Sequence, residues 1–218
     1  VAVGMEAEAR MAVEAGILTG TDLVTVLAGQ NDILAQYQLV KALSVTEAQA
    51  SAVLEQLGTD LAAQVNRVAL AGGKVLISTV PDLGLTPFAI AENVDNAALL
   101  TRLSFSFNKK LRLGIINDGH MIGLLLTDEM VQSIVRSVQL GQTSTFVDVT
   151  HEACNSTLVP LVQNCTALTL VDYTGLVGTP GIPATATGWL WADATHLSAG
   201  GHASLGSAAA NRASGNPF

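Results

Sequence analysis

Charged side chains are scarce in this sequence. Only 13% of the 218 residues are Asp, Glu, Lys or Arg, whereas 49% are hydrophobic. Disordered chains have the opposite balance, because a chain with few apolar side chains cannot offset the entropy that is lost on folding. The composition therefore excludes a largely disordered chain, and the length predicts one globular domain over residues 1–218.

Basic residues and long apolar runs are also few. Ten Lys and Arg residues stand against 18 acidic ones, which gives a formal net charge of −8. Nucleic-acid binding requires a positively charged surface, so we expect no nucleic-acid partner. No uninterrupted apolar run reaches the roughly 18 residues that a membrane-spanning helix needs, so we expect no stable transmembrane segment.

Cysteine occurs only twice, at Cys154 and Cys165, within a segment rich in Asn, Ser and Thr. A disulfide between them would indicate an oxidising compartment, and we therefore expect a secreted or periplasmic protein. Two free thiols are one alternative. A metal site that includes His151 is another, although it lacks a fourth ligand at a suitable spacing.

Short β-like runs alternate with helical periodicity, which is typical of an α/β fold with a mainly parallel sheet. A capping box of Ser44 and Glu47 is expected to begin the second helix, and residues 141–188 are expected to be rich in loops. The predicted strands are 23–28, 74–80 and 113–116, and the predicted helices are 5–15, 46–71, 93–111, 127–140 and one that starts near Ser198.

The residues Gly29-Gln30-Asn31-Asp32 follow the first predicted strand, at the point where it meets a loop. Ligands bind at the carboxyl ends of the strands in open α/β sheets. An Asn side-chain amide placed there can donate a hydrogen bond to an oxyanion. The alternative is that these residues serve only as a turn.

Asp193 precedes His196 by three residues. A carboxylate at that spacing in a turn can reach the imidazole and orient it, as in a Ser-His-Asp triad. Asp148 and His151 have the same spacing, so the spacing alone does not choose between the pairs. Residues 189–191, Trp-Leu-Trp, precede the first pair and are expected to wall a hydrophobic cleft.

Gly-x-Asn-Asp after a strand, followed by Trp-x-Asp-x-x-His-x-Ser-x-x-Gly-His at residues 191–202, resembles the third and fifth sequence blocks of the GDSL/SGNH hydrolases. Residues 80–87 and 117–118 resemble loops of its plant-type and bacterial autotransporter-esterase branch. The resemblance covers residues 20–210. It implies a flavodoxin-like three-layer α/β/α fold, ester hydrolysis through an acyl-enzyme, a small-molecule or lipid ester as substrate, and no metal or organic cofactor.

The resemblance also implies a role for each matching residue. His196 would be the general base and Asp193 would orient it. Asn31 would donate to the oxyanion, and Gly29 would keep the neighbouring turn tight. The opening Val-Ala-Val-Gly resembles the second block, in which the backbone N–H of Gly4 would complete the oxyanion hole.

The serine that the family carries in a Gly-Asp-Ser block is not present in these 218 residues. Ser78 falls inside a predicted strand, and Ser198 begins a helix. We therefore expect an N-terminally incomplete domain without its first strand, whose partner is a missing N-terminal segment that carries the serine. The alternatives are a non-catalytic α/β binding module and a carbohydrate acetylesterase of the same family.

The pair Asp148/His151 has no counterpart in the family motif. We interpret it as surface structure near the cysteine-containing loop.

Overall fold

The structure is a computed structural model, and it describes residues 13, 16, 18–116 and 119–215. Gly4, residues 117–118 and nearly all of the helix predicted over 5–15 lie outside the described residues. The elements are β1 (Leu23–Val26), α2 (Gln30–Lys41), α3 (Glu47–Leu70), β2 (Lys74–Ser78), η1 (Leu83–Leu85), α4 (Pro87–Glu92), α5 (Val94–Gly114), β3 (Ile122–Leu125), α6 (Thr127–Gln139), β4 (Asp148–Glu152), η2 (Val162–Asn164), β5 (Trp189–Trp191) and α7 (Ala199–Ser214).

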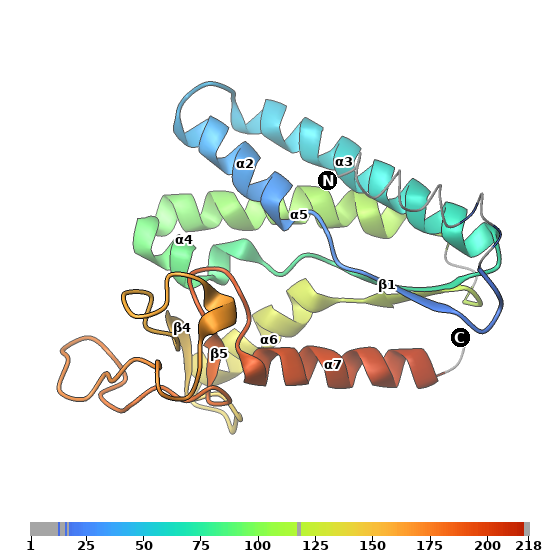
Figure 1. The fold of residues 1–218 in the computed structure, drawn as a ribbon. Coiled ribbons are helices and arrows are strands. Elements are labelled where there is room, and N and C mark those ends of the chain that lie inside the picture. The colour runs from blue at the N-terminus through green and yellow to red at the C-terminus, as the bar shows by residue number, and fades with distance from the viewer. Residues whose placement is uncertain (1–12, 14–15, 17, 117–118, 216–218) are drawn as a thin grey trace.

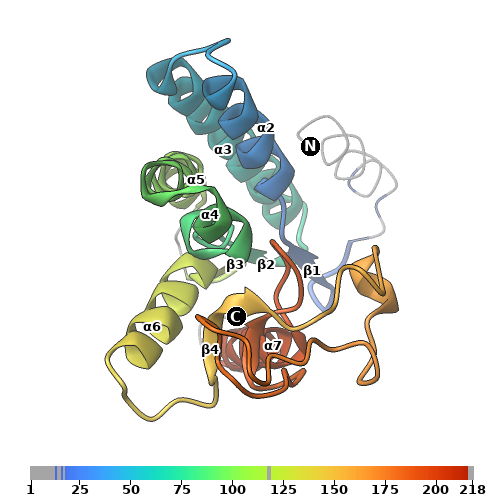
Figure 2. The same cartoon turned by 90° about the vertical axis from the view of Figure 1, so that its left-hand side faces the viewer.

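Parallel strands form two small sheets. The first has the order β1-β2-β3, and the second pairs β4 with β5. Helices α2, α3 and α5 lie on one side of the first sheet and α7 lies on the other (Figures 1 and 2). The predicted α/β class with parallel strands is therefore confirmed.

The helical layer over the first sheet is held together by the pair α3 and α5. A side chain at Gly58 of α3 would lie 2.4 Å from the backbone oxygen of Phe107 in α5, so the two helices approach more closely than any residue with a Cβ would allow. Leu54, Leu100 and Leu103 are fully buried beside this contact. Among the described residues, no helix is long and apolar enough to span a membrane.

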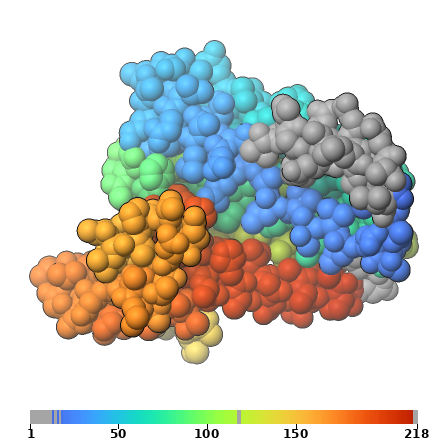
Figure 3. Space-filling model, in the orientation of Figure 1, coloured from blue at the N-terminus to red at the C-terminus, as the bar shows by residue number. Residues whose placement is uncertain are grey.

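Residues 141–198, which we call the C-terminal lobe, protrude beyond the end of the first sheet where β1 and β2 end (Figures 1 and 3). The lobe contains β4, β5 and a disulfide between Cys154 and Cys165, as predicted. A separate hydrophobic core lies between α6, the two strands of the lobe and Leu197. The lobe thus has its own packing and joins the rest of the chain at the carboxyl edge of the sheet.

Three sequence predictions were wrong in detail. Residues 113–116 are not a strand, because α5 continues to Gly114 and the third strand is β3. The capping box of α3 is Thr46 with Gln49, not Ser44 with Glu47. Gly29 does not lead into a loop but is the N-cap of α2. Helices α2 and α4 and strands β4 and β5 were not predicted at all.

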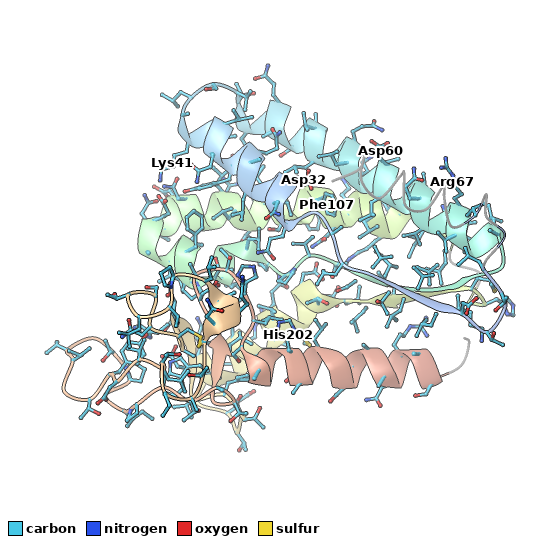
Figure 4. The ribbon with its side chains drawn as sticks, in the orientation of Figure 1. Asp32, Lys41, Asp60, Arg67, Phe107 and His202 are labelled. Atoms are coloured by element: carbon cyan, nitrogen blue, oxygen red, sulfur yellow. A yellow bond between two sulfur atoms is a disulfide. The ribbon has the colours of Figure 1, made fainter. Side chains whose placement is uncertain are left out.

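The turn from β1 into α2 depends on Gly29. Its φ of 112° lies in the left-handed region that side chains with a Cβ rarely adopt. A Cβ built there would lie 2.4 Å from the ring of Phe107, which projects from α5 beneath the start of α2 (Figure 4). Only glycine satisfies both the conformation and the contact.

We predict that Gly29→Ala lowers the free energy of unfolding by more than Gly72→Ala does. Gly72 also has a positive φ, 99°, but no atom lies within 4 Å of a Cβ built on it. Both variants introduce backbone strain of about 1–3 kcal/mol, and only Gly29→Ala adds a steric clash of about 1–3 kcal/mol. Urea unfolding of both variants measures the difference. Equal losses would mean that the Phe107 ring moves aside without cost.

Candidate active site

Asn31 stands in the first turn of α2, at the carboxyl end of β1. Its side chain is exposed. Residues 27–31 line a hollow of about 390 Å³, and within the described part of the chain the only other residue that lines it is His196. The strand end and the C-terminal lobe therefore meet at this hollow, although about 165 residues separate them in the sequence.

Asp193 organises the turn that carries His196. Its Oδ1 accepts hydrogen bonds from the backbone N–H groups of Thr195, at 2.9 Å, and His196, at 2.7 Å. Its Oδ2 lies 2.9 Å from Nδ1 of the His196 imidazole. One carboxylate thus fixes both the backbone of the turn and the direction of the ring.

The hydrogen bond to the Asp193 carboxylate favours the tautomer of His196 in which Nδ1 carries the proton. In that tautomer, the lone pair of Nε2 is available to accept a proton. The His196 side chain is 57% exposed, whereas that of Asp193 is 26% exposed. The orienting carboxylate is therefore the more sheltered of the two, and the basic nitrogen is accessible to a substrate.

Two contacts attach this turn to the rest of the chain. The backbone N–H of Phe88, in α4, donates to the carbonyl oxygen of Ala194 at 2.9 Å. The side-chain amide of Gln30, next to Asn31, lies 3.5 Å from the carbonyl oxygen of Thr195. The first contact attaches the turn to α4. The second contact orients the turn toward the start of α2.

The second pair, Asp148 and His151, has nearly the same local geometry. Oδ2 of Asp148 lies 2.8 Å from Nδ1 of His151, and its Oδ1 accepts from the backbone N–H of His151 at 2.6 Å. The hydrogen bonds within the two turns therefore do not distinguish one pair from the other.

The surroundings do distinguish the pairs. His151 packs against the ring of Tyr173 and lines a different hollow, of about 640 Å³, beside Pro87 and Ile90 of α4. Residues 27–31 do not line that hollow. Among the described residues, only His196 faces the strand end that carries Asn31.

Glu152 is a carboxylate close to the Asp193 turn. Burial raises the pKa of Glu152 above its ordinary value of 4.5, and the negative charge of Asp193 raises it further. Burial likewise raises the pKa of Tyr173 to about 12, with contributions from Asp148 and Glu152, and its hydroxyl donates to the backbone oxygen of Glu152 at 2.7 Å. The carboxyl groups of Asp148, Glu152 and Asp193 therefore lie near one another in this part of the lobe.

The Trp-Leu-Trp segment does not wall a cleft, as the sequence suggested. Trp189, Leu190 and Trp191 form β5 and are fully buried. The indole N–H of Trp191 donates to the carbonyl oxygen of Val149 at 3.0 Å. The three side chains therefore support the Asp193 turn from inside the lobe.

Neither serine considered in the sequence faces the imidazole. The Ser78 hydroxyl contacts the hydroxyl of Thr127 and the carbonyl oxygen of Thr79, and its residue is buried. The Ser198 hydroxyl donates to the carbonyl oxygen of Trp189 and accepts from the N–H of Gly201, so it caps α7. Within the described part of the chain, no group of three or more His, Cys, Asp or Glu residues could hold a metal ion.

A comparison with protein families matches the family described as GDSL-like lipase/acylhydrolase, over residues 9–209. No curated protein sequence matches the chain.

We predict that Glu152→Gln increases stability at pH 7 and that this increase disappears toward pH 4. Because its pKa is raised in the folded state, the Glu152 carboxyl contributes stability below about pH 4.5 that is lost as the pH rises through the raised value. Glutamine cannot ionise and avoids that loss. Thermal unfolding of wild type and variant across this pH range measures the effect.

Glu47→Gln is the control of opposite sign. The hydrogen bond from Arg102 lowers the pKa of Glu47, so its contribution is present above about pH 4.5 and is lost as the pH falls. Glu47→Gln should therefore lower stability at pH 7 and have less effect at low pH. A Glu152→Gln effect that is independent of pH would show that neither burial nor the Asp193 charge raises the pKa of Glu152 in the folded state.

Proposed function

The chain belongs to the GDSL-like lipase/acylhydrolase family, and on this premise we propose that it supplies the base and the oxyanion donor of a carboxylic-ester hydrolase. The observation that carries the proposal is the shared hollow in which the exposed His196 meets residues 27–31. The substrate is a small-molecule or lipid ester. The mechanism proceeds through an acyl-enzyme formed on a serine.

His196 is the general base in this proposal, and Asp193 is its positioning residue. The carboxylate holds the Nδ1–H tautomer and stabilises the imidazolium that forms when Nε2 takes a proton. Three hydrogen bonds from one turn restrain Asp193, so the imidazole is oriented before the substrate binds. Such preorganisation avoids a rearrangement during the reaction.

Asn31 is the oxyanion donor. Its side-chain amide stands in the first turn of a 12-residue helix, where backbone N–H groups and the helix dipole also favour negative charge. Gly29 holds that turn against Phe107 and so fixes the position of the donor relative to His196.

The reaction follows from these positions. The serine hydroxyl attacks the ester carbonyl while His196 accepts its proton, and Asn31 donates to the oxygen that becomes negative. The intermediate collapses, and His196 returns the proton to the departing alcohol. Water then attacks the acyl-enzyme by the same route and releases the carboxylic acid and the serine hydroxyl.

The serine itself comes, in this proposal, from a segment outside these 218 residues. No Gly-Asp-Ser occurs in the sequence. Among the described residues, only one edge of β1 is paired, with β2; Leu23 at its start is 47% exposed, and Leu27, directly after its end, is 53% exposed. A strand that carries the serine would pair with the other edge and cover these leucines.

The disulfide supports a secreted or periplasmic location, because disulfides persist in oxidising compartments. A carbohydrate acetylesterase would use the same residues in the same roles. A non-catalytic binding module would keep the fold and lack turnover, so an activity measurement separates this alternative from both esterases.

We predict that p-nitrophenyl butyrate is hydrolysed only when the segment encoded upstream is joined to the 218-residue chain. The serine is required for the acyl-enzyme, and the shorter chain does not contain it in the expected motif. Release of p-nitrophenol by the two purified proteins measures this. Turnover by the shorter chain would place the nucleophile within it, and two folded but inert proteins would favour the binding module.

In the active protein, His196→Ala should abolish turnover, whereas His151→Ala should leave it nearly unchanged. The two histidines have matched hydrogen bonds to their Asp partners, so the comparison isolates position from local geometry. A loss confined to His151→Ala would assign the base to the Asp148/His151 pair and overturn the choice of His196.

Asn31→Ala should lower kcat by about 10²–10³-fold, the usual loss for one oxyanion donor. KM should change less, because the donor acts mainly on the charge that develops in the transition state. Steady-state kinetics with the same ester give both constants. An unchanged kcat would remove Asn31 from the site.

A further inference from the structure

His196 also lines a second hollow. It has a volume of about 350 Å³ and extends from His196 toward the disulfide. It shares no lining residue except His196 with the hollow at residues 27–31. His196 therefore lines two separate hollows, and Asn31 lines only one of them.

The walls of this second hollow, which we call the disulfide hollow, come from two parts of the lobe and from α7. One wall is the segment around Cys165, including Val162 and Ala167. Another part of the lining includes Ala186 and the first turn of α7, where His202 lies beside the lobe (Figure 4). Cys154 and Cys165 both line the hollow, so the disulfide forms part of its wall.

The chemistry of the lining selects a neutral, apolar ligand. Alanine, valine, leucine and the disulfide contribute most of it, and no Asp, Glu, Lys or Arg is among the lining residues. The chain as a whole carries a net charge of −8. Apart from the imidazoles of His196 and His202, the lining contains no ionisable side chain, so the hollow suits an alkyl group and offers no carboxylate, ammonium or guanidinium to a charged one.

The position of His196 decides which part of an ester this alkyl group belongs to. The carbonyl oxygen must point toward Asn31, in the hollow at residues 27–31. The departing alcohol oxygen must face Nε2 of His196, because that nitrogen returns the proton to it. The group bonded to that oxygen then continues past the imidazole, on the side away from Asn31.

We propose that the disulfide hollow is the binding subsite for the alcohol portion of the ester, and that it accepts a short or medium alkyl chain. This assignment rests on the proposed roles of His196 and Asn31. At roughly 30 Å³ for a group the size of a water molecule, a volume of about 350 Å³ holds about twelve such groups. The subsite therefore suits esters of alkyl alcohols rather than esters of sugars, whose many hydroxyls would find few partners there.

The disulfide contributes to this subsite by holding one wall in place. It closes the loop between Cys154 and Cys165, 11 positions apart, and this loop carries Val162. Without the cross-link, the wall is held only by the remaining contacts of the loop, and ordering it would cost conformational entropy each time a ligand binds.

The test uses two neutral probes of equal chain length and requires no turnover. 1-Hexanol represents the alcohol portion, and hexanamide represents the acyl portion with its carbonyl. Each is titrated into the folded 218-residue chain, and the backbone NMR signals of Ala167, Ala186 and His202 are followed. We expect hexanol to shift these signals in a saturable manner and hexanamide to shift them much less.

Substitutions inside and just outside the hollow test whether hexanol binds there. Ala167→Trp and Ala186→Trp each introduce a large side chain at a lining position of the disulfide hollow, and each should weaken hexanol binding by about tenfold or more. Leu168→Trp is the control, because Leu168 is the next residue in the same segment, is 94% exposed and does not line the hollow. Hexanol affinity should be nearly unchanged in this variant.

Reduction of the disulfide, or the double change Cys154→Ser and Cys165→Ser, should weaken hexanol binding while the signals of α3 and α5 stay in place. Unaltered affinity would show that the cross-link does not shape the subsite.

The proposal is overturned if hexanol leaves all three signals unmoved, if hexanamide moves them and hexanol does not, or if Leu168→Trp weakens binding as much as Ala167→Trp. Because binding is read without a serine, these outcomes are independent of whether the longer protein turns over esters. Hexanol binding in a protein without turnover would leave an alkanol-binding hollow in place and would remove both the proposed reaction and the assignment of the hollow to the alcohol portion of an ester.

Discussion

The contact between Gly29 and the ring of Phe107 fixes the geometry on which the site depends. It holds the start of α2 against α5 at a distance that leaves no space for a Cβ. The position of Asn31 relative to the sheet is set by this contact, because Asn31 lies two residues further along the same helix. The lobe contributes one side chain to this hollow, that of His196, and the helical layer sets the position of the residues that His196 meets there.

The two Asp-x-Thr-His turns separate what local sequence determines from what the fold determines. Each Asp side chain bonds the backbone and the imidazole of its own turn, so the local chemistry of Asp148 and Asp193 is the same. Their surroundings differ because one pair lies within β4 and the other follows β5. The sequence could therefore predict two oriented histidines, and the choice of His196 required the neighbouring Ser-x-x-Gly-His residues and the family resemblance.

The sequence predicted long elements with regular apolar spacing, such as α3. It did not predict the ends of helices that are set by contacts with residues distant in the sequence. Helix α5 runs on to Gly114 because the side chain of Asn66, in α3, bonds the carbonyl oxygen of Gly114 and the N–H of Ile116, both at 2.8 Å. Ser44 does not cap α3 because its N–H bonds the carbonyl oxygen of Leu39 and closes the end of α2. The short strands of the lobe have too few residues to show a period.

The described residues pack into separate hydrophobic cores, and this separation has a consequence for how the protein would lose function. The core around α3 and α5 includes the side chains that support Asn31, whereas the Asp193 turn rests on the separate core of β4, β5 and α6. Regions with separate packing open as separate cooperative units, each with its own free energy. Opening of the lobe alone would withdraw the base from an oxyanion donor that stays folded, so catalysis would report the local stability of the lobe rather than the global stability of the chain.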